Sequence, residues 1–401
     1  MGRRGRKAEA IAASGEPTEA REALERRWRD RMIVEPRLAT LVTAEGGRRE
    51  PFHRWIPYKQ GFSPGLVRQF LSENPRTLKK WASHPLLDPF CGSGTCIVEC
   101  ARHGVSAMGI EALDSLVFLT KVKFEREFPA FPDFSGASTW QEMADQLESR
   151  VHRAALMLAV GRRHTTDGRA NRGAKPLNIL IGEVSAMMRD DLAHPLNQVN
   201  RIEIGDARSL ATIEDGAIGG ILTSPPYLSR YDYSRISSPY DTVYAHWYGE
   251  NGGVEQVRAA SRGWLKCTEV KGERAESTTS PSRIPPSPYI SITDEVSEWL
   301  TRNGQARLAG VVRGYMEDLA MVMQECHRVL TLNGACWMVV GGARVKDAYV
   351  PADLMAAEIA EACGFQVERI RVARDLVGSP RKFGRLGHVA PRETLLVLQN
   401  Q

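Results

Sequence analysis

Leu86-Leu87-Asp88-Pro89-Phe90-Cys91-Gly92-Ser93-Gly94-Thr95 is the stretch that decides the fold. An apolar strand runs into a Gly-x-Gly turn, and residues 96–102 continue as a plausible helix. Glycines let the backbone turn tightly and approach a ligand, and a helix N-terminus offers unpaired N–H groups to an anion. No Lys-[Ser/Thr] follows, as a phosphate-binding P-loop requires, and the third glycine of the dinucleotide fingerprint is missing. Taken alone, the stretch indicates no more than a structural turn.

Carboxylates at the ends of further strands give that turn a context. Residues 107–111 predict a short strand that ends in Glu111, placed to hydrogen-bond a ribose diol. Residues 202–207 alternate in polarity and predict a strand that ends at Asp206. An open α/β sheet places its ligand crevice at such strand ends. Each residue could also be a turn or helix-cap residue, but their order along the chain favours a ligand site.

A second motif, Thr223-Ser224-Pro225-Pro226-Tyr227, follows the apolar run 219–222. Two successive prolines fix two φ angles and remove two N–H donors, so the strand has to stop there. The segment then presents a hydroxyl, rigid carbonyls and an aromatic ring, which suit a flat heterocycle with an exocyclic amine. Ser224 Oγ and the Pro225 carbonyl would accept the amine hydrogens, and Tyr227 would stack on the ring. An ordinary strand-end turn is the alternative.

Together the two motifs resemble those of the amino-methylating (N4-cytosine/N6-adenine) site-specific DNA methyltransferases. Residues 88–95 resemble the adenosylmethionine-binding motif of this family, and 223–227 resemble its catalytic Asp/Asn/Ser-Pro-Pro-Tyr/Phe motif. Residues 53–64 resemble the segment that precedes the first strand and closes the cofactor pocket. The resemblance covers 51–125 and 200–235, and it extends weakly to 311–401, where a helix, a turn at Asn333-Gly334 and a fifth strand are expected. It implies an α/β fold with a Rossmann-like, seven-stranded S-adenosylmethionine-dependent methyltransferase sheet carrying two insertions.

The resemblance also implies roles for individual residues. Asp206 would accept a hydrogen bond from the adenine amine of the cofactor, and the turn from Asp88 to Thr95 would surround its methionine end. Ser63 and Pro64 are independently typical of a helix N-cap and first turn. The expected catalytic residues are Ser224, Pro225, Pro226 and Tyr227. The expected cofactor-binding residues are Tyr58, Phe62, Ser63, Asp88, Phe90, Cys91, Gly92, Gly94, Thr95, Glu111 and Asp206.

The reaction predicted from these residues is methyl transfer to an exocyclic amine of a base in duplex DNA. Methylation at cytosine C5 needs a cysteine nucleophile, and this chain has Pro-Pro-Tyr where that chemistry uses Pro-Cys. In the family, Ser-Pro-Pro-Tyr goes mostly with cytosine N4, so N4 is favoured over adenine N6. The sequence also leaves open an RNA base N-methyltransferase and a nucleic-acid-binding module without turnover. A cognate restriction endonuclease acting on the same site is a possible partner.

Metal chemistry is not expected. Cys91, Cys96 and Cys100 have C-x4-C-x3-C spacing, which misses the plant-type iron–sulfur pattern by one residue. The sequence contains no pair of CxxC motifs of the kind that binds zinc.

Composition is that of an ordinary globular protein. The 401 residues are 42% hydrophobic and 25% charged, and no apolar run approaches the roughly 20 residues that span a bilayer. The N-terminus lacks a secretory signal, Arg6 excludes the myristoylation pattern, and seven cysteines suggest a reducing compartment. These features predict a cytoplasmic protein with no membrane association, and the resemblance implies a bacterial enzyme whose substrate is the nucleoid DNA. The net charge of +5 permits nucleic-acid binding but is too small to argue for it. Basic residues cluster near both ends of the chain; such clusters are most often only solvated, and contact with DNA phosphates is the alternative. They are Arg3, Arg4, Arg6, Lys7, Arg371, Arg374, Arg381, Lys382 and Arg385.

Six segments are expected along the chain. A basic tail and a charged helix (17–32) occupy 1–45, and the cofactor-binding half follows at 46–125. An insertion at 126–200 contains a helical stretch (140–148) and a basic linker around 162–164. The catalytic half is 201–235, and the remaining sheet and C-terminal strands are 311–401. Between them, 236–310 is an insertion rich in Ser, Pro and Gly that reads as a long loop and a candidate target-recognition region.

Overall fold

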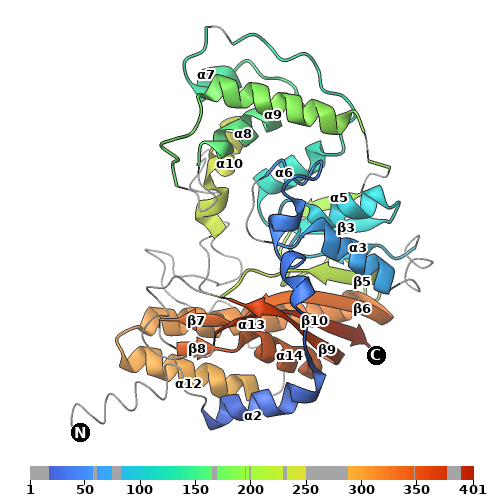
Figure 1. The fold of residues 1–401 in the computed structure, drawn as a ribbon, viewed down its shortest axis with the longest axis vertical. Coiled ribbons are helices and arrows are strands. Elements are labelled where there is room, and N and C mark those ends of the chain that lie inside the picture. Colours follow the sequence, from blue (N-terminus) through green and yellow to red (C-terminus); the bar gives the residue numbers. More distant parts are fainter. Residues whose placement is uncertain are drawn as a thin grey trace. The chain divides into compact units, whose positions relative to one another are not determined.

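The computed structural model describes residues 18–56, 61–74, 83–134, 136–164, 169–194, 196–197, 200–228, 233–249, 288–346, 348–376 and 390–401 (Figure 1). The chain forms two compact units. The unit that contains the expected cofactor-binding residues, 43–207 and 232–264, is called the cofactor unit below. The unit that contains the expected catalytic motif, 1–42, 208–231 and 265–401, is called the catalytic unit. Within the described part of the chain, no helix has the length and apolar character needed to cross a membrane.

Three parallel strands form the sheet portion of the cofactor unit, in the order β2-β3-β4. They are β2 (Leu86–Asp88), β3 (Ala107–Glu111) and β4 (Arg201–Ile204). In register, Asp88 lies opposite Gly109 and Glu111 opposite Ile204, so the three carboxyl ends lie at one edge. Helices α3 (Pro64–Glu73), α5 (Thr95–Arg102) and α6 (Asp114–Val122) belong to the same unit. The predicted strands and the helix after the Gly-x-Gly turn are confirmed, although β4 stops two residues before Asp206.

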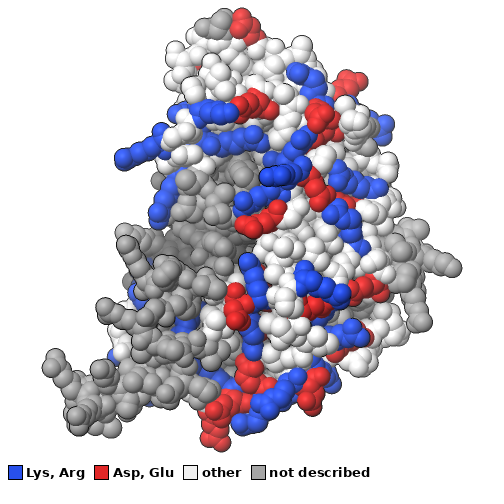
Figure 2. Space-filling view, viewed as in Figure 1, with Lys and Arg blue, Asp and Glu red and all other residues white. Residues whose placement is uncertain are grey.

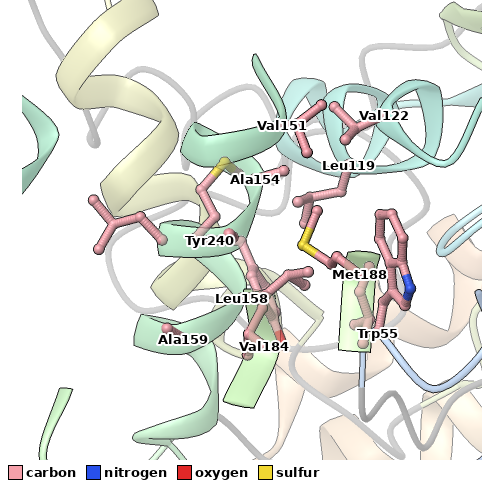
Figure 3. Close-up of a cluster of buried hydrophobic side chains, with 14 of the residues drawn as sticks. Trp55, Leu119, Val122, Val151, Ala154, Leu158, Ala159, Val184, Met188 and Tyr240 are labelled. Carbon is pink, nitrogen blue, oxygen red and sulfur yellow. The ribbon is translucent and has the colours of Figure 1, made fainter. Parts of the chain in front are cut away.

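The remainder of the cofactor unit is helical. It contains α7 (Trp140–Ala144), α8 (Arg150–Arg162), α9 (Leu177–Leu192) and α10 (Tyr233–Tyr248). Side chains from α6, α8, α9 and α10 pack with Trp55 into one buried apolar cluster (Figure 3). Two sequence expectations are corrected here. The helix expected over 140–148 ends at Ala144, because the Gln146 N–H turns back to the Met143 carbonyl and Leu147 enters the core. Arg162 lies in the last turn of α8 and not in a linker.

Asp191 ties the segment before the first strand to this helical part. Its carboxylate lies fully buried on α9 and accepts hydrogen bonds from the Phe52 backbone N–H and from Trp55 Nε1, both at 2.7 Å. The Arg54 guanidinium forms an ion pair with the same carboxylate. One buried charge therefore holds the segment that resembles the pocket-closing segment of the family.

Five strands form the sheet of the catalytic unit, in the order β1-β9-β10-β6-β5. β5 and β6 are parallel, β10 is antiparallel to both neighbours, and β1 is parallel to β9. Around them lie helices and a hairpin of two short strands. The elements are α2 (Glu19–Trp28), β1 (Met32–Val34), β5 (Ile218–Thr223), α12 (Pro288–Arg302), α13 (Ala306–Val329), β6 (Leu330–Gly341), β7 (Ala343–Val345), β8 (Ala348–Val350), α14 (Ala352–Ala362), β9 (Phe365–Asp375) and β10 (Arg392–Asn400).

The N-terminal region of the catalytic unit differs from expectation. The helix predicted over 17–32 ends at Trp28, and a 3-10 turn (Arg29–Arg31) leads into β1. Residues 32–34 include β-branched Ile33 and Val34, and they pair with β9 from Ile370 to Val372. The eight-stranded sheet to which both units contribute strands therefore includes the seven that the resemblance implies and one more, β1.

Two further expectations are corrected in the catalytic unit. The turn expected at Asn333-Gly334 lies inside β6, where Asn333 has a φ of 62° and the pairing with β5 shifts register. The described part of the insertion at 236–310 is mostly helical, in α10, α12 and the start of α13, because apolar side chains such as Val243 and Val296 face the core there. Its Ser/Pro-rich centre, 277–282, lies outside the described residues.

Candidate active site

The Gly-x-Gly turn of the cofactor unit has a shape that requires both glycines. Gly92 and Gly94 have φ angles of +52° and +79°, in the left-handed region that other residues rarely adopt. A Cβ at position 94 would overlap Thr120 Cγ2. The Gly94 N–H donates to the Cys91 carbonyl at 2.8 Å, and α5 begins at the next residue. The turn therefore holds its backbone close to α6 and presents the N-terminus of α5.

Glu111 connects this turn to the end of the neighbouring strand. Its Oε2 accepts from the Gly92 N–H at 2.7 Å, and its Oε1 accepts from the N–H groups of Ala112 and Leu113 at 2.9 and 3.0 Å. Burial raises the pKa of the Glu111 carboxyl above its usual value, while these three N–H donors act in the opposite direction. Oε1 already accepts two hydrogen bonds and Oε2 accepts one, so one acceptor site on Oε2 is left for a ribose hydroxyl.

The other two expected acidic residues lie at the adjoining strand ends. Asp88 is buried, and its Oδ1 accepts from the Phe90 N–H at 3.1 Å. Asp206 is half-buried, and the preceding Gly205 donates to the Glu111 carbonyl at 3.0 Å. The structure thus brings Asp88, Glu111 and Asp206 to the same edge of the β2-β3-β4 sheet.

Ser63 is the residue that best indicates a ligand in the cofactor unit. It precedes α3 as predicted, but its hydroxyl does not cap the helix. Ser63 Oγ is buried and has no hydrogen-bond partner among the described residues. A buried hydroxyl in that state is costly, so a ligand group that bonds it would be stabilised. Phe62 beside it is buried, and Tyr58 lies outside the described residues.

The remaining expected cofactor-binding residues, Phe90, Cys91 and Thr95, differ in how far they are buried. Phe90 and Thr95 are half-buried. Cys91 is buried beneath β3, where a Cβ on Gly109 would lie 2.6 Å from its sulfur, and burial raises the pKa of its thiol well above the usual value. Cys91 therefore fills space under the turn, as a small core side chain does.

Lys123 is a residue that sequence reasoning missed. It follows α6, is 1% exposed, and its Nζ donates to the Ser93 carbonyl of the turn at 2.6 Å. Burial lowers the pKa of the Lys123 ammonium to about 8. The Trp55 ring lies 6.0 Å from Nζ, within the range of a cation–π interaction. The sequence signal was weak, because Lys123 is the second of two lysines at the end of a mostly apolar helix.

In the catalytic unit, Ser224 lies immediately after β5. The strand ends at Thr223, as the two prolines predict, and Thr223 lies opposite Met338 of β6. Ser224 Oγ donates to the Val339 carbonyl at 3.3 Å. This bond uses the hydroxyl proton, so the oxygen lone pairs are left to accept. Pro225 is buried and Pro226 half-buried.

Tyr227 is held at its hydroxyl and at one edge of its ring. Its hydroxyl donates to Glu393 Oε1 at 3.0 Å, and its side chain is 8% exposed. Its ring lies against Gly341, where a Cβ would come within 2.8 Å of Tyr227 Cδ2. Glu393 in turn accepts from Arg374 Nε at 2.6 Å. Sequence reasoning identified Tyr227 but neither of these two contacts, nor the pairing of Arg374 with Glu393.

Of the basic residues considered for phosphate contact, only Arg371 and Arg374 lie in the described part of the chain. Arg371 is 4% exposed and forms an ion pair with Glu35, whose carboxyl pKa it lowers, so it is not available to DNA. Arg374 is more exposed but pairs with Glu393. The other seven basic residues lie outside the described residues. On the face shown in Figure 2, positive and negative side chains are interspersed.

The aromatic residues that follow the catalytic motif are mostly structural where they are described. Tyr240 is buried in the apolar cluster, and Tyr244 and Trp247 pack against that cluster. Tyr248 is 39% exposed, and its hydroxyl accepts from Arg153 at 2.9 Å. The target-recognition role expected of 236–310 stays a prediction, and within the described part Tyr248 is its best-placed aromatic residue.

Comparison with known proteins supports the resemblance. No protein-family model matches the chain. The chain is 24% identical over 454 residues to the Type II methyltransferase M.AvaI of a Nostoc strain, covering 94% of this chain and 92% of that protein. It is 22% identical to the Type II methyltransferase M.BsoBI of Geobacillus stearothermophilus, covering 89% and 87%. Similarity along almost the whole of both chains supports the DNA methyltransferase family.

Among solved structures, a geranyl diphosphate methyltransferase in complex with GPP and sinefungin gives a TM-score of 0.35 at 9% identity, covering 96% of this chain and all of that one. TrmN from Thermus thermophilus gives 0.32 at 12% identity, covering 88% and 53%. These scores are low, and the fold assignment rests on the strand order and register described above.

Proposed function

We propose that this relative of the Type II methyltransferases transfers a methyl group from S-adenosylmethionine to the exocyclic N4 amine of cytosine in duplex DNA. The observation that carries the proposal is the catalytic motif at the end of a buried strand, with Ser224 Oγ donating to the Val339 carbonyl and Tyr227 anchored by Glu393. A role as the modification enzyme of a restriction-modification system is part of the proposal, because the curated relatives are named Type II methyltransferases.

The residues of the cofactor unit fit S-adenosylmethionine. Glu111 Oε2 would accept a hydrogen bond from a ribose hydroxyl, and Asp206 would accept one from the adenine amine. The turn from Asp88 to Thr95 would surround the methionine end, where the N-terminus of α5 offers N–H groups to the carboxylate. The buried Ser63 hydroxyl, which lacks a partner among the described residues, would complete the site. When bound, the cofactor supplies an electrophilic methyl group on a positively charged sulfur.

The catalytic residues would act by positioning the amine. The lone pair of an exocyclic amine is delocalised into its ring, so the nitrogen is a poor nucleophile. Ser224 Oγ and the Pro225 carbonyl would accept the two amine hydrogens and draw the nitrogen toward tetrahedral geometry. The nitrogen would bond to the methyl carbon as the carbon–sulfur bond breaks and its electron pair stays on sulfur, and the surplus proton of the amine would pass to water. No covalent intermediate with the protein is required.

Tyr227 would bind the target base by stacking. A base inside a duplex cannot reach the end of β5, so it has to leave the base stack first. Stacking on an aromatic side chain offsets part of that cost, typically by about 1–3 kcal/mol per base. The preference for cytosine N4 over adenine N6 rests on Ser224, since serine in this motif resembles the N4-specific members of the family.

Methyl transfer from labelled S-adenosylmethionine to duplex DNA and to RNA, followed by nucleoside analysis, tests the proposal. We expect N4-methylcytosine in DNA. N6-methyladenine would be consistent with the mechanism but would refute cytosine as the target base. Label in RNA alone would refute DNA as the substrate. No label on either, over a broad set of DNA sequences, would refute the proposed function and favour a binding module without turnover. Ser224→Ala is the matched control for transfer that depends on the motif.

A further inference from the structure

We infer that Gly341, Glu393 and Arg374 are positioning residues for the target base, because together they fix the plane of the Tyr227 ring. These three residues are called the tyrosine seat below. The inference deepens the proposed function and rests on it, since the ring acts on a base only if the protein binds one. All three residues and Tyr227 belong to the catalytic unit.

The tyrosine seat is built across three adjacent strands. Glu393 on β10 lies directly opposite Gly341, the last residue of β6, and opposite Arg374 on β9. The position of Glu393 is therefore set by two ladders of backbone hydrogen bonds and not by its side chain alone. Tyr227 follows the end of β5 and contacts two of these residues, Glu393 and Gly341.

Hydrogen bonds fix one end of the ring. The Tyr227 hydroxyl donates to Glu393 Oε1 at 3.0 Å, while Arg374 Nε donates to Glu393 Oε2 at 2.6 Å. Each carboxylate oxygen thus has a donor of its own. Glu393 is 4% exposed, and a buried carboxylate is costly unless it is paired and hydrogen-bonded. Arg374, with a side chain that is 40% exposed, supplies the compensating charge.

Backbone contact fixes the edge of the ring. A Cβ at position 341 would lie 2.8 and 2.9 Å from Tyr227 Cδ2 and Cε2, and 3.2 Å from Leu376 Cδ1. Only glycine leaves room for the ring edge against the strand at this position. With its edge and its hydroxyl both held, the ring keeps one orientation before a base arrives. Ordering costs at the moment of binding are then small, which favours stacking.

Kinetics of four variants test the tyrosine seat: Tyr227→Phe, Glu393→Ala, Glu393→Gln and the double variant Tyr227→Phe/Glu393→Ala. We expect Glu393→Ala to lower kcat/KM for DNA on the order of tenfold, the size typical of a lost hydrogen bond to a charged group. Tyr227→Phe should lose a similar factor, and the double variant should be no worse than either single one. Glu393→Gln, which keeps an acceptor for the phenol, should recover part of the loss.

Two controls separate positioning from general stability. The cofactor dissociation constant, measured by calorimetry, should stay at the wild-type value in all four variants. Glu368→Ala removes an exposed glutamate from β9 and should leave both kinetics and melting temperature unchanged. If Glu393→Ala does not fold, Tyr227→Phe decides alone, because it keeps the ring and removes only the anchored hydroxyl.

Wild-type kcat/KM in Tyr227→Phe, or a full tenfold further loss when Glu393→Ala is added to it, would overturn the tyrosine seat. The ¹⁹F NMR signal of 3-fluorotyrosine at position 227, assigned with Tyr227→Phe, provides a readout that needs no DNA. It should shift in Glu393→Ala and move less in Glu393→Gln. An unshifted signal would refute the anchor, whereas a shifted signal in a protein that methylates no DNA would refute the proposed function alone.

Discussion

The two motifs are stabilised in opposite ways. In the cofactor unit, Glu111 bonds Gly92, 19 residues before it, and the two residues that follow it. In the catalytic unit, Ser224 and Tyr227 bond groups that lie 115 and 166 residues away. The cofactor turn is therefore a local construction, whereas the catalytic motif depends on strands that come last in the chain.

The two regions also differ in the charge that meets their buried acids. Glu111 is surrounded by neutral backbone N–H donors, and burial raises its pKa above the usual value. Glu393 receives a charge-assisted hydrogen bond from Arg374. If this contrast holds, substitutions in the catalytic unit should change turnover, while substitutions in the cofactor unit should change cofactor affinity and stability. Four predictions test it, from the largest expected effect to the smallest.

Ser224→Ala should lower kcat on the order of 10²–10³-fold, the loss typical when one preorganised hydrogen-bonding group is removed from a reacting centre. The cofactor dissociation constant should not change, because the serine acts on the amine. Single-turnover methyl transfer and calorimetry measure the two quantities separately. Equal losses in both would contradict the assigned role.

Lys123→Met should remove a pH dependence of stability. The Lys123 ammonium has a pKa of about 8 in the folded chain against an ordinary 10.5, so the folded state loses its proton first as pH rises. Wild type should therefore gain free energy of unfolding relative to the variant between about pH 8 and 10.5, approaching roughly 3 kcal/mol. Below pH 8 both states are protonated and the difference should be flat.

Urea denaturation of both proteins at pH 7 and pH 10 measures this gain. Lys121→Met is the matched control, since Lys121 is an exposed lysine near the end of the same helix. We expect the free energy of unfolding of wild type to rise from pH 7 to pH 10 relative to Lys123→Met but not relative to Lys121→Met. A rise relative to Lys121→Met alone would show that Lys123 is not the group that titrates.

Glu111→Gln should raise the cofactor dissociation constant by about 10- to 100-fold, because it removes a charged acceptor and places an amide N–H₂ near the Gly92 N–H. Turnover at saturating cofactor should change much less. Glu127→Gln, an exposed glutamate of the same unit, is the control. Unchanged affinity would show that the carboxylate only braces the turn.

Asp206→Ala should have the smallest effect, about a fivefold rise in the cofactor dissociation constant, as expected for one ordinary hydrogen bond. Wild type and Asp206→Ala should bind a cofactor analogue that lacks the adenine amine with equal dissociation constants, since both then make the same contacts. An identical fivefold loss with that analogue would argue against the assigned contact.

Sequence predicted the elements of both regions where the signals are local. The apolar runs 86–88 and 107–111, the Gly-x-Gly turn and the paired prolines each specify a backbone shape within a few residues, and the structure contains all of them. Boundaries shifted where longer-range pairing intervened, as at β1, which pairs with β9 and replaces the end of the predicted helix. The residue-level roles of the site stay predictions until the experiments above are made.

Side-chain partners distant in sequence were missed or misassigned. An arginine-rich segment looks the same whether its residues face solvent or the core, and Arg371 proved to be buried against Glu35. Asp191 and Lys123 carry no motif, and their importance appears only when α9 and α6 are folded against 51–56 and the turn.

By itself, the sequence determined that the chain has a glycine turn after a buried strand, acidic residues at successive strand ends, and a Ser-Pro-Pro-Tyr segment that cannot continue a strand. These follow from backbone sterics and short-range periodicity, which act over a few residues. Tertiary structure alone decided which groups hold Tyr227, because Gly341, Arg374 and Glu393 become neighbours only when β6, β9 and β10 pair. That pairing is a property of the packed sheet, and no local pattern encodes it.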